Sequence, residues 1–193
     1  DVVGHGTTVA QLAAGAPVGQ WPGGIAPGAQ ILSARIIADK APTDDGSGKG
    51  NEVTGALGMA AIHADLIRDG MRIMNNSWGG LYWTRPNVTA EIANEYRPFI
   101  NNSDGLVVFA TGNESKSNPS DMAALPSKVG NPGSYPAADL ERGWLAVAAL
   151  DTAKPTALAS YSIACGVAKN FCFFLSGSAL FIGHDSTANN LSY

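Results

Sequence analysis

The chain has 193 residues, of which 45% are apolar and 15% charged, and its net charge is −4. This length and composition can bury one sizeable core, so we expect a single domain over residues 1–193 rather than a disordered segment. The acidic balance argues against a nucleic-acid partner. The sequence contains no run of about 18 apolar residues, so we expect no membrane-spanning segment in these 193 residues.

Apolar periodicity and turn residues divide the first part of the chain into helices and strands. In chain order we expect a helix over 6–14, a strand over 30–37, a surface loop over 39–50, a helix over 51–69 and a strand over 72–76. Gly70, directly after the second helix, is typical of a helix C-terminus.

The same alternation continues in the second part. We expect a helix over 87–100, a strand over 106–110, a proline-rich loop over 118–138, a strand over 144–150 and short marginal strands from 157 onward. Pro98 should kink or end the third helix, and the apolar run 106–110 should be covered on both faces. Together these elements predict an α/β fold with a mostly parallel central sheet flanked by helices.

Two polar motifs follow predicted strands directly. Ser77-Trp78-Gly79 follows the strand 72–76, and Gly112-Asn113 follows the strand 106–110. The carboxyl ends of parallel strands meet at one edge of a sheet, and α/β proteins bind ligands there. The pattern alone therefore places a ligand site at this edge.

Three motifs in this order carry the chemistry: Gly4-His5-Gly6-Thr7-Thr8, Asn75-Asn76-Ser77-Trp78-Gly79-Gly80 and Ala110-Thr111-Gly112-Asn113. The glycines beside His5 let a substrate approach an imidazole that could act as a general base. Each motif alone is more often a helix start or a turn. Together they resemble the subtilisin-like serine proteases.

Further matches to that family extend along nearly the whole chain: Gly24–Ala29, Tyr135–Ala137, Gly143–Val147 and Ala159–Ser162. The last two, with Cys165 and Cys172 after them, look most like the protease domains of Gram-negative bacterial autotransporters. The resemblance implies a three-layer subtilisin-like fold, a serine endopeptidase acting by a Ser-His-Asp triad, protein or peptide substrates, and a secreted or bacterial cell-surface location.

The resemblance also implies roles for individual residues. His5 would be the base and Asn113 the oxyanion-hole donor. Ser77, Trp78 and Gly79 would pair with the substrate backbone, and Ala110, Thr111 and Gly112 would form a wall of the specificity pocket. For Trp78, core packing is an equally open interpretation.

Two triad members have no match within the chain. The family's aspartate lies about thirty residues before the histidine, and Asp1 is only four positions from His5, where a helix cap is the ordinary interpretation. No Gly-Thr-Ser occurs, and matching Leu175-Ser176-Gly177 to the family's Ala-Pro-Gly turn puts the nucleophile beyond Tyr193. Ser178 and Ser186 are less favoured alternatives. We therefore expect a truncated peptidase domain that is inactive by itself.

Cysteine and metal-ligand patterns give three further expectations. Six residues separate Cys165 from Cys172, which can close a small disulfide loop in an oxidising compartment, two free thiols being the alternative. His63 and His184 are isolated, so no zinc site is expected. The family's calcium loop falls at 16–22, where mostly apolar side chains and Val18 in place of the usual asparagine argue against calcium.

Two other functions remain open at this stage. A homologue without catalytic residues would bind peptides without cleaving them, and only the flanking sequence separates it from an enzyme. An unrelated doubly wound domain would bind a nucleotide, but the chain has no Gly-x-Gly-x-x-Gly after its first strand.

Overall fold

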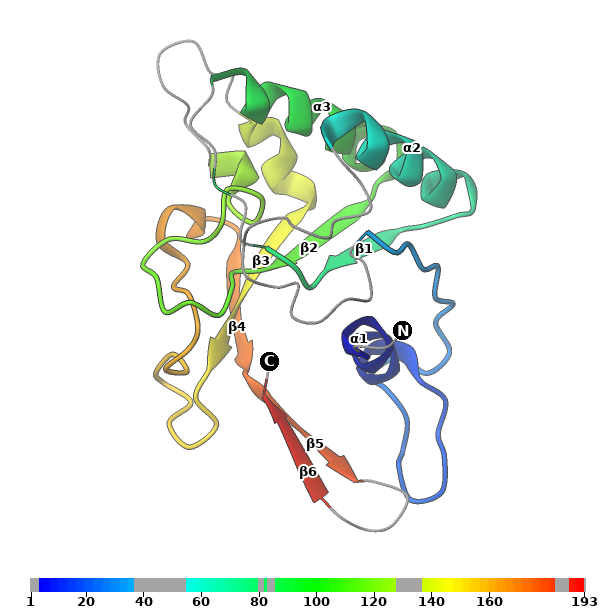
Figure 1. Cartoon of the computed structure of the whole chain (residues 1–193), viewed down its shortest axis with the longest axis vertical. Coiled ribbons are helices and arrows are strands. Elements are labelled where there is room, and N and C mark those ends of the chain that lie inside the picture. The colour runs from blue at the N-terminus through cyan, green and yellow to red at the C-terminus, as the bar shows by residue number, and fades with distance from the viewer. Residues whose placement is uncertain are drawn as a thin grey trace.

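The computed structural model describes residues 4–36, 55–79, 82, 86–127, 137–182 and 188–192. Within these ranges, only the backbone is described for residues 55–57, 86–87, 178–182 and 188–192. A four-stranded parallel sheet lies at its centre, in the order β1-β2-β3-β4 (Figure 1). Its strands are β1 (Ile73–Asn76), β2 (Leu106–Ala110), β3 (Trp144–Leu150) and β4 (Cys172–Ser176).

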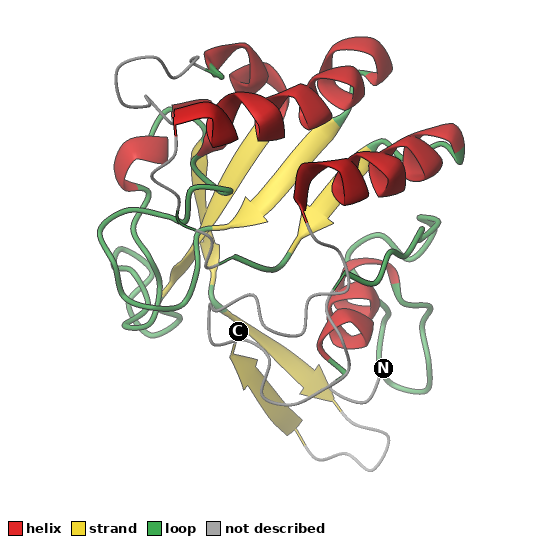
Figure 2. Ribbon diagram, turned by 45° about the horizontal axis from the view of Figure 1, so that its top comes forward, coloured by secondary structure: helices red, strands yellow, loops and turns green. Residues whose placement is uncertain are grey.

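Helices lie on two sides of this sheet. The helices α2 (Gly55–Arg68) and α3 (Pro86–Ser103) pack side by side on one of them. The helix α1 (His5–Ala14) lies on the other side of β1, and both views agree on this placement (Figures 1 and 2). The expected α/β architecture with a mostly parallel sheet between helices is confirmed.

Short elements complete the described part of the chain. Three 3₁₀ turns connect the larger elements: η1 (Leu125–Ser127), η2 (Ala138–Gly143) and η3 (Gly166–Ala168). An antiparallel hairpin of β5 (Ser178–Ile182) and β6 (Ala188–Ser192) projects away from the parallel sheet (Figure 1). Within the described residues, no helix combines the length and apolarity that crossing a bilayer requires.

Two expectations about these elements were wrong, and one of two alternatives at Pro98 does not occur. The segment 30–36 forms no strand, and Ile31 is 48% exposed; alternation marks a strand-like pattern but does not supply a partner for the backbone. Of the two outcomes expected at Pro98, a kink or an end of the helix, the end does not occur, because α3 continues to Ser103. Only one face of β2 is buried among the described residues, because Val107 and Phe109 are fully covered while Val108 is half-buried.

Aromatic rings form the core between the sheet and the α2–α3 layer. Tyr96 of α3 meets Trp144 of β3 edge to face at 5.0 Å, and Phe109 of β2 stacks on the same indole at 5.4 Å. The indole nitrogen of Trp144 donates to the carbonyl of Ala123 at 3.1 Å, so its polar atom is satisfied. Each ring pair adds on the order of 0.5–1.5 kcal/mol to the gain from burying apolar area.

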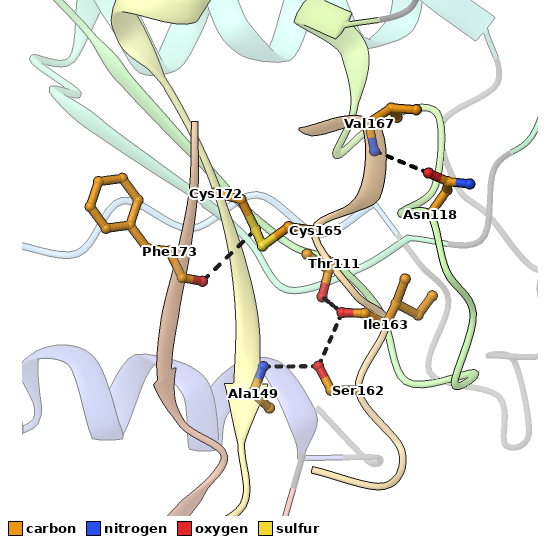
Figure 3. Close-up of a disulfide and its surroundings, with 9 residues drawn as sticks. All are labelled: Thr111, Asn118, Ala149, Ser162, Ile163, Cys165, Val167, Cys172 and Phe173. Atoms are coloured by element: carbon orange, nitrogen blue, oxygen red, sulfur yellow. Dashed lines mark hydrogen bonds between the residues drawn. A yellow bond between two sulfur atoms is a disulfide. The ribbon is translucent and has the colours of Figure 1, made fainter. Parts of the chain in front are cut away.

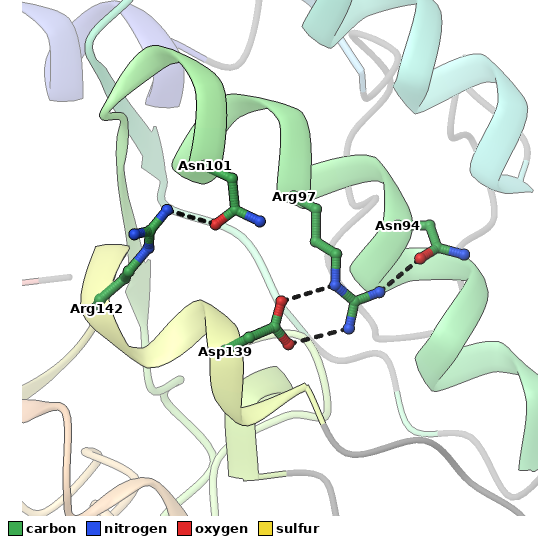
Figure 4. A network of polar contacts seen from close by, with 5 residues as sticks. All are labelled: Asn94, Arg97, Asn101, Asp139 and Arg142. Atoms are coloured by element: carbon green, nitrogen blue, oxygen red, sulfur yellow. Dashed lines mark hydrogen bonds and ion pairs between the residues drawn. The ribbon is translucent and has the colours of Figure 1, made fainter.

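A polar network joins α3 to the 3₁₀ turn η2 that leads into β3 (Figure 4). Two nitrogens of Arg97 donate to the two carboxylate oxygens of Asp139, at 2.8 and 3.0 Å, and Arg142 donates to Asn101 at 2.7 Å. The hydrogen bonds from Arg97 hold the pKa of Asp139 below its usual value. Because Arg97 and Asp139 are both partly exposed, their ion pair contributes only about 1 kcal/mol or less to the free energy of unfolding.

Unpaired polar atoms lie at the seam between α2 and α3. His63 is 3% exposed, its Nδ1 has no hydrogen-bond partner, and its ring lies 4.9 Å from that of Tyr96. Oε1 of Glu95 and the hydroxyl of Tyr96 are also buried without a partner. Burial lowers the pKa of His63 to about 4 and raises the pKa of Glu95 to about 7, so folding favours the neutral form of both groups.

The two shifts predict opposite dependences of stability on pH. Folded His63 binds fewer protons than unfolded His63 between about pH 4 and 6.5, so its contribution to stability falls on acidification through that window. Folded Glu95 binds more protons than its unfolded form between pH 4.5 and about 7, so its contribution falls as pH rises there.

We therefore expect two single variants to tilt the stability profile in opposite directions between pH 4.5 and 6.5. Relative to the parent, Glu95→Gln should make the free energy of unfolding rise with pH, by up to about 2 kcal/mol across the window. His63→Phe should make it fall, by at least as much, because His63 is more deeply buried than Glu95. Urea denaturation at several pH values measures both, and profiles parallel to the parent in either variant would contradict the assignment.

Candidate active site

Glycine and local hydrogen bonds start α1 at His5. Gly4 precedes the helix in a left-handed conformation, with φ of +78°, which an L side chain rarely adopts. The backbone amide and the hydroxyl of Thr8 both donate to the carbonyl of Gly4, each at 2.9 Å. His5 is thereby fixed as the first residue of the helix.

The chain returns to close the other end of α1. The amides of Gly24, Ile25 and Ala26 donate to the carbonyls of Gly15, Leu12 and Ala13, at 2.8–3.0 Å. These bonds satisfy carbonyls that a helix C-terminus leaves unpaired. A Cβ on Gly24 would lie 2.7 Å from backbone atoms of α1, so the close approach requires glycine.

His5 contacts the segment that follows β1. Its Nε2 lies 3.0 Å from the carbonyl oxygen of Ser77, across 72 residues of sequence. A carbonyl oxygen can only accept a hydrogen bond, so Nε2 carries the proton in this arrangement. The contact brings together two of the predicted site residues.

Side-chain hydrogen bonds fix the segment after β1. Nδ2 of Asn76 lies 3.3 Å from the carbonyl of Met74 and 3.4 Å from that of Val108, and its Oδ1 accepts from the indole of Trp78 at 3.1 Å. The indole packs edge to face on Phe109 at 5.3 Å. The side chain of Trp78 is therefore engaged with the core, which leaves its backbone as the part available to a substrate.

The turn after β2 is held by the segment 159–164, which we call the clamp segment (Figure 3). The hydroxyl of Thr111 donates to the carbonyl of Ile163 at 2.9 Å, and the amide of Ile163 donates to the carbonyl of Gly112 at 2.9 Å. Further on, the amide and hydroxyl of Ser115 donate to the carbonyls of Tyr161 and Ser160. Bonds on both sides therefore hold the turn that carries Asn113.

Asn113 itself is exposed on this turn. Gly112 has a φ of +118°, and a Cβ there would lie 2.7 Å from Cδ1 of Ile163, so the turn requires glycine. Because Asn76 pairs with Phe109 in the parallel register, Ser77 and Asn113 both lie beyond the carboxyl ends of neighbouring strands. The expected ligand edge thus carries residues from all three sequence motifs.

Other predicted residues take different positions. The side chain of Thr111 is 1% exposed and bonded to Ile163, so only its backbone can contribute to a pocket wall. A Cβ on Gly79 would lie 3.4 Å from the Ser120 hydroxyl oxygen, so the loop that carries Ser120 packs close to the segment Ser77–Gly79. Asp1 and Ser186 lie outside the described residues, as does the Ser178 side chain.

Sequence reasoning missed two features of this edge. It matched Ala159–Ser162 to the family without giving the segment a role, although its hydrogen bonds hold the turn bearing Asn113. It also missed Lys116, whose ammonium lies 3.2 Å from the Tyr82 hydroxyl and 4.3 Å from its ring centre. Pairings across 34 to 52 residues leave no periodic signal that could have revealed them.

A disulfide fixes the end of the clamp segment (Figure 3). Cys165 and Cys172 are bonded with their Cα atoms 5.7 Å apart, which joins the start of η3 to the first residue of β4. Within the same loop, the amide of Val167 donates to Oδ1 of Asn118 at 3.0 Å. The loop that follows Asn113 is therefore attached to the sheet at a second point.

Comparison with known proteins identifies the family. The model of the subtilase family, peptidase S8, matches residues 1–192. This chain belongs to the subtilase family. The fold, the order of the three motifs and this match agree, and the subtilisin-like resemblance is confirmed.

Individual relatives share fold and part of the sequence. Serotype-specific antigen 1 of Mannheimia haemolytica is 33% identical over 124 residues, which are 58% of this chain and 12% of the antigen. The MycP3 protease of the type VII (ESX-3) secretion system gives a TM-score of 0.61 at 22% identity, covering 97% of this chain and 56% of that one. The prenylagaramide maturation protease PagA gives a TM-score of 0.50 at 17% sequence identity, covering 72% of this chain and 43% of that one.

Side-chain oxygens are scarce in the loop 16–22, where the resemblance places the family's calcium loop. Calcium takes about six to eight oxygen ligands, and Gln20 is the only residue of 16–22 whose side chain carries an oxygen. The carbonyls of Val18 and Trp21 accept each other's amides at 3.0–3.1 Å, which folds the loop on itself. No group of three or more metal-ligating side chains occurs among the described residues.

We expect Thr111→Val to loosen the turn that carries Asn113. The substitution keeps the shape of the side chain but removes the hydroxyl that donates to Ile163, at a cost of about 1 kcal/mol. Hydrogen exchange at the amides of Ile163 and Ser115 should accelerate. Thr111→Ser keeps the hydroxyl and is the control, and equal acceleration in both variants would show that the hydrogen bond is not responsible.

We expect the disulfide to contribute to stability through its short loop. Eight residues including both cysteines are closed, for which the chain-entropy model gives about 2–3 kcal/mol. The double variant Cys165→Ser, Cys172→Ser should lose about this amount in chemical denaturation. Titration of the denatured, unreduced protein with Ellman's reagent should find no reactive thiol, whereas two reactive thiols would contradict the bond.

Proposed function

We propose that this subtilase-family domain belongs to a serine endopeptidase that hydrolyses peptide bonds of protein or peptide substrates by a Ser-His-Asp triad. The observation that carries the proposal is the contact of His5 with Ser77 at the sheet edge where Asn113 lies. The chain spans 12% of the antigen and about half of the two proteases compared above, so the activity of the whole protein is a proposal.

In this proposal His5 is the general base. The base must accept the nucleophile's proton at Nε2 while Nδ1 donates to a carboxylate. Since Nε2 donates to Ser77 in the present arrangement, the imidazole must release that carbonyl and move its proton to Nδ1. We infer that the orienting aspartate and the nucleophilic serine come from segments outside these 193 residues.

Asn113 is proposed to stabilise the oxyanion. Its side-chain amide can donate to the alkoxide that forms on the attacked carbonyl, and donors fixed in advance are the effective ones. The hydrogen bonds from the clamp segment to Gly112 and Ser115 support this role because they restrain both sides of Asn113. The backbone of Ser77–Gly79 would pair with the substrate, and Ala110–Gly112 would line the specificity pocket.

We further propose a secreted or bacterial cell-surface protein of the autotransporter type. The disulfide suits an oxidising compartment, and a bacterial antigen shares part of the sequence. We propose that catalysis needs no metal or other cofactor, in line with the scarcity of side-chain oxygens in the loop 16–22.

We expect Asn113→Ala, in the full-length protein, to lower kcat far more than it raises KM. The lost hydrogen bond forms mainly in the transition state, and removing the corresponding donor in subtilisin itself costs about 10²–10³-fold. His5→Ala should remove nearly all activity. Rates of peptide hydrolysis over a range of substrate concentrations measure both effects.

Asn102→Ala, at an exposed position near the end of α3, is the matched control and should leave both constants unchanged. A rise in KM with unchanged kcat in Asn113→Ala would show a ground-state binding role instead. A parent protein that binds a labelled peptide but never cleaves it would favour the non-catalytic peptide-binding homologue.

A further inference from the structure

Two side chains join the segments that leave β1 and β2 at the candidate edge. The ammonium of Lys116, three residues after Asn113, donates to the hydroxyl of Tyr82 at 3.2 Å and lies 4.3 Å from the centre of its ring. Tyr82 comes three residues after Gly79, and it is 48% exposed. No step of the proposed hydrolysis uses this pair.

The backbone that carries Lys116 is held by the clamp segment. The carbonyl of Lys116 accepts from the amide of Ala164 at 3.0 Å. The preceding residue, Ser115, donates to the clamp segment with both its amide and its hydroxyl. The ammonium is therefore presented from a backbone that is already ordered, so that less entropy is lost when a ligand uses it.

The charge and the donors of the pair indicate which ligand fits. Among the described residues, no ion pair involves Lys116. The carboxylate of Glu114 lies against Gly112 instead, with Oε2 3.2 Å from where a Cβ on that glycine would lie. The ammonium has three N–H donors, and the hydroxyl of Tyr82 keeps its own O–H when it accepts from one of them. Two neighbouring donors, one of them charged, match the two oxygens of a carboxylate.

The pair lies within reach of a substrate at the candidate edge. Three residues of extended chain span at most about 11 Å, which bounds the distance from Asn113 to Lys116. The same bound holds for the distance from Gly79 to Tyr82. In the proposed function Asn113 contacts the attacked carbonyl, and Gly79 belongs to the segment that pairs with the substrate backbone. An extended substrate advances about 3.3 Å per residue, so a side chain within about three residues of the cleaved bond can contact the pair.

We propose that Lys116 and Tyr82 form a carboxylate subsite, by which the domain selects substrates with an acidic side chain within about three residues of the cleaved bond. This inference rests on the proposed peptidase function. The carboxylate accepts from the ammonium and from the phenol hydroxyl, while the cation stays beside the ring. Because Lys116 and Tyr82 are both exposed, water and salt screen the contact, and the preference is about 3- to 5-fold.

The test uses acetylated, amidated peptides of alanine, leucine and serine that carry Glu or Gln at one position at a time, so that each peptide has no other charge. Fluorescence anisotropy measures their binding to the full-length His5→Ala variant, and cleavage is measured with the parent. At one or two positions, Glu should bind about 3- to 5-fold more tightly than Gln and should raise kcat/KM by a similar factor. The preference should disappear at about 1 M NaCl.

Four variants separate the subsite from a structural role. Lys116→Met removes the ammonium and should abolish the preference while leaving the binding of Gln peptides unchanged, and Lys116→Arg should retain most of it. Tyr82→Phe keeps the ring but loses a donor, so the preference should fall only in part. Arg68→Met is the charge-matched control, since α2 ends there before the amino end of β1, and it should leave the preference intact.

The inference is overturned if Glu and Gln peptides bind equally at every position, or if Arg68→Met removes the preference as fully as Lys116→Met does. Equal weakening of Glu and Gln peptides by Lys116→Met would show that the side chain only supports the local fold. Binding that prefers Glu without any cleavage by the parent would refute the proposed peptidase function and leave the subsite standing. Cleavage without a preference for Glu would do the reverse.

Discussion

The candidate active edge depends on the hydrogen bonds between the clamp segment and the turn after β2. That turn has no regular secondary structure, and its glycine adopts a conformation that gives no rigidity of its own. Backbone and side-chain bonds to Ile163, Tyr161 and Ser160 replace the missing ladder. The conformational entropy of this turn is therefore lost during folding, and under the proposed function it would not have to be lost again when substrate binds.

The clamp segment is itself held to the sheet from its middle and from the residue that follows it. The hydroxyl of Tyr161 donates to the carbonyl of Gly177 beyond β4 at 2.7 Å, and the Ser162 hydroxyl accepts from Ala149 of β3 at 2.9 Å (Figure 3). At its end, the disulfide ties Cys165 to β4. A chain of fixed contacts therefore runs from two strands of the sheet to the turn bearing Asn113.

The two sides of the candidate site are held to different degrees. Asn113 sits on a turn braced by the sheet, whereas α1, which carries His5, has no buried residue among those described. Its position rests on the returning loop and on the contact with Ser77. In the proposed mechanism this asymmetry would let the His5 imidazole exchange the Ser77 carbonyl for a nucleophile, while Asn113 stays in place as the oxyanion donor.

The sequence predicted those parts of the fold whose signal is local. The strands β2 and β3 were found because runs such as Val107–Phe109 are apolar, and their carboxyl ends located the candidate edge by topology alone. Alternation over 30–37 failed because it cannot show whether a partner strand is present. The clamp segment and the unpartnered Nδ1 of His63 could not be foreseen, since each depends on segments that fold together from distant positions.

Buried polar groups divide the molecule into two regions. Near the candidate active edge, Asn76, Thr111 and Ser162 each have a hydrogen-bond partner within the protein. In the described part of the chain, the buried side-chain atoms without a partner belong to His63, Glu95 and Tyr96, which share the α2–α3 seam. Scattered packing defects would not gather at one place, and their combined cost of several kcal/mol is large beside the 5–15 kcal/mol that stabilises a typical domain. The unsatisfied polar groups therefore gather in the α2–α3 seam, away from the edge that carries His5 and Asn113.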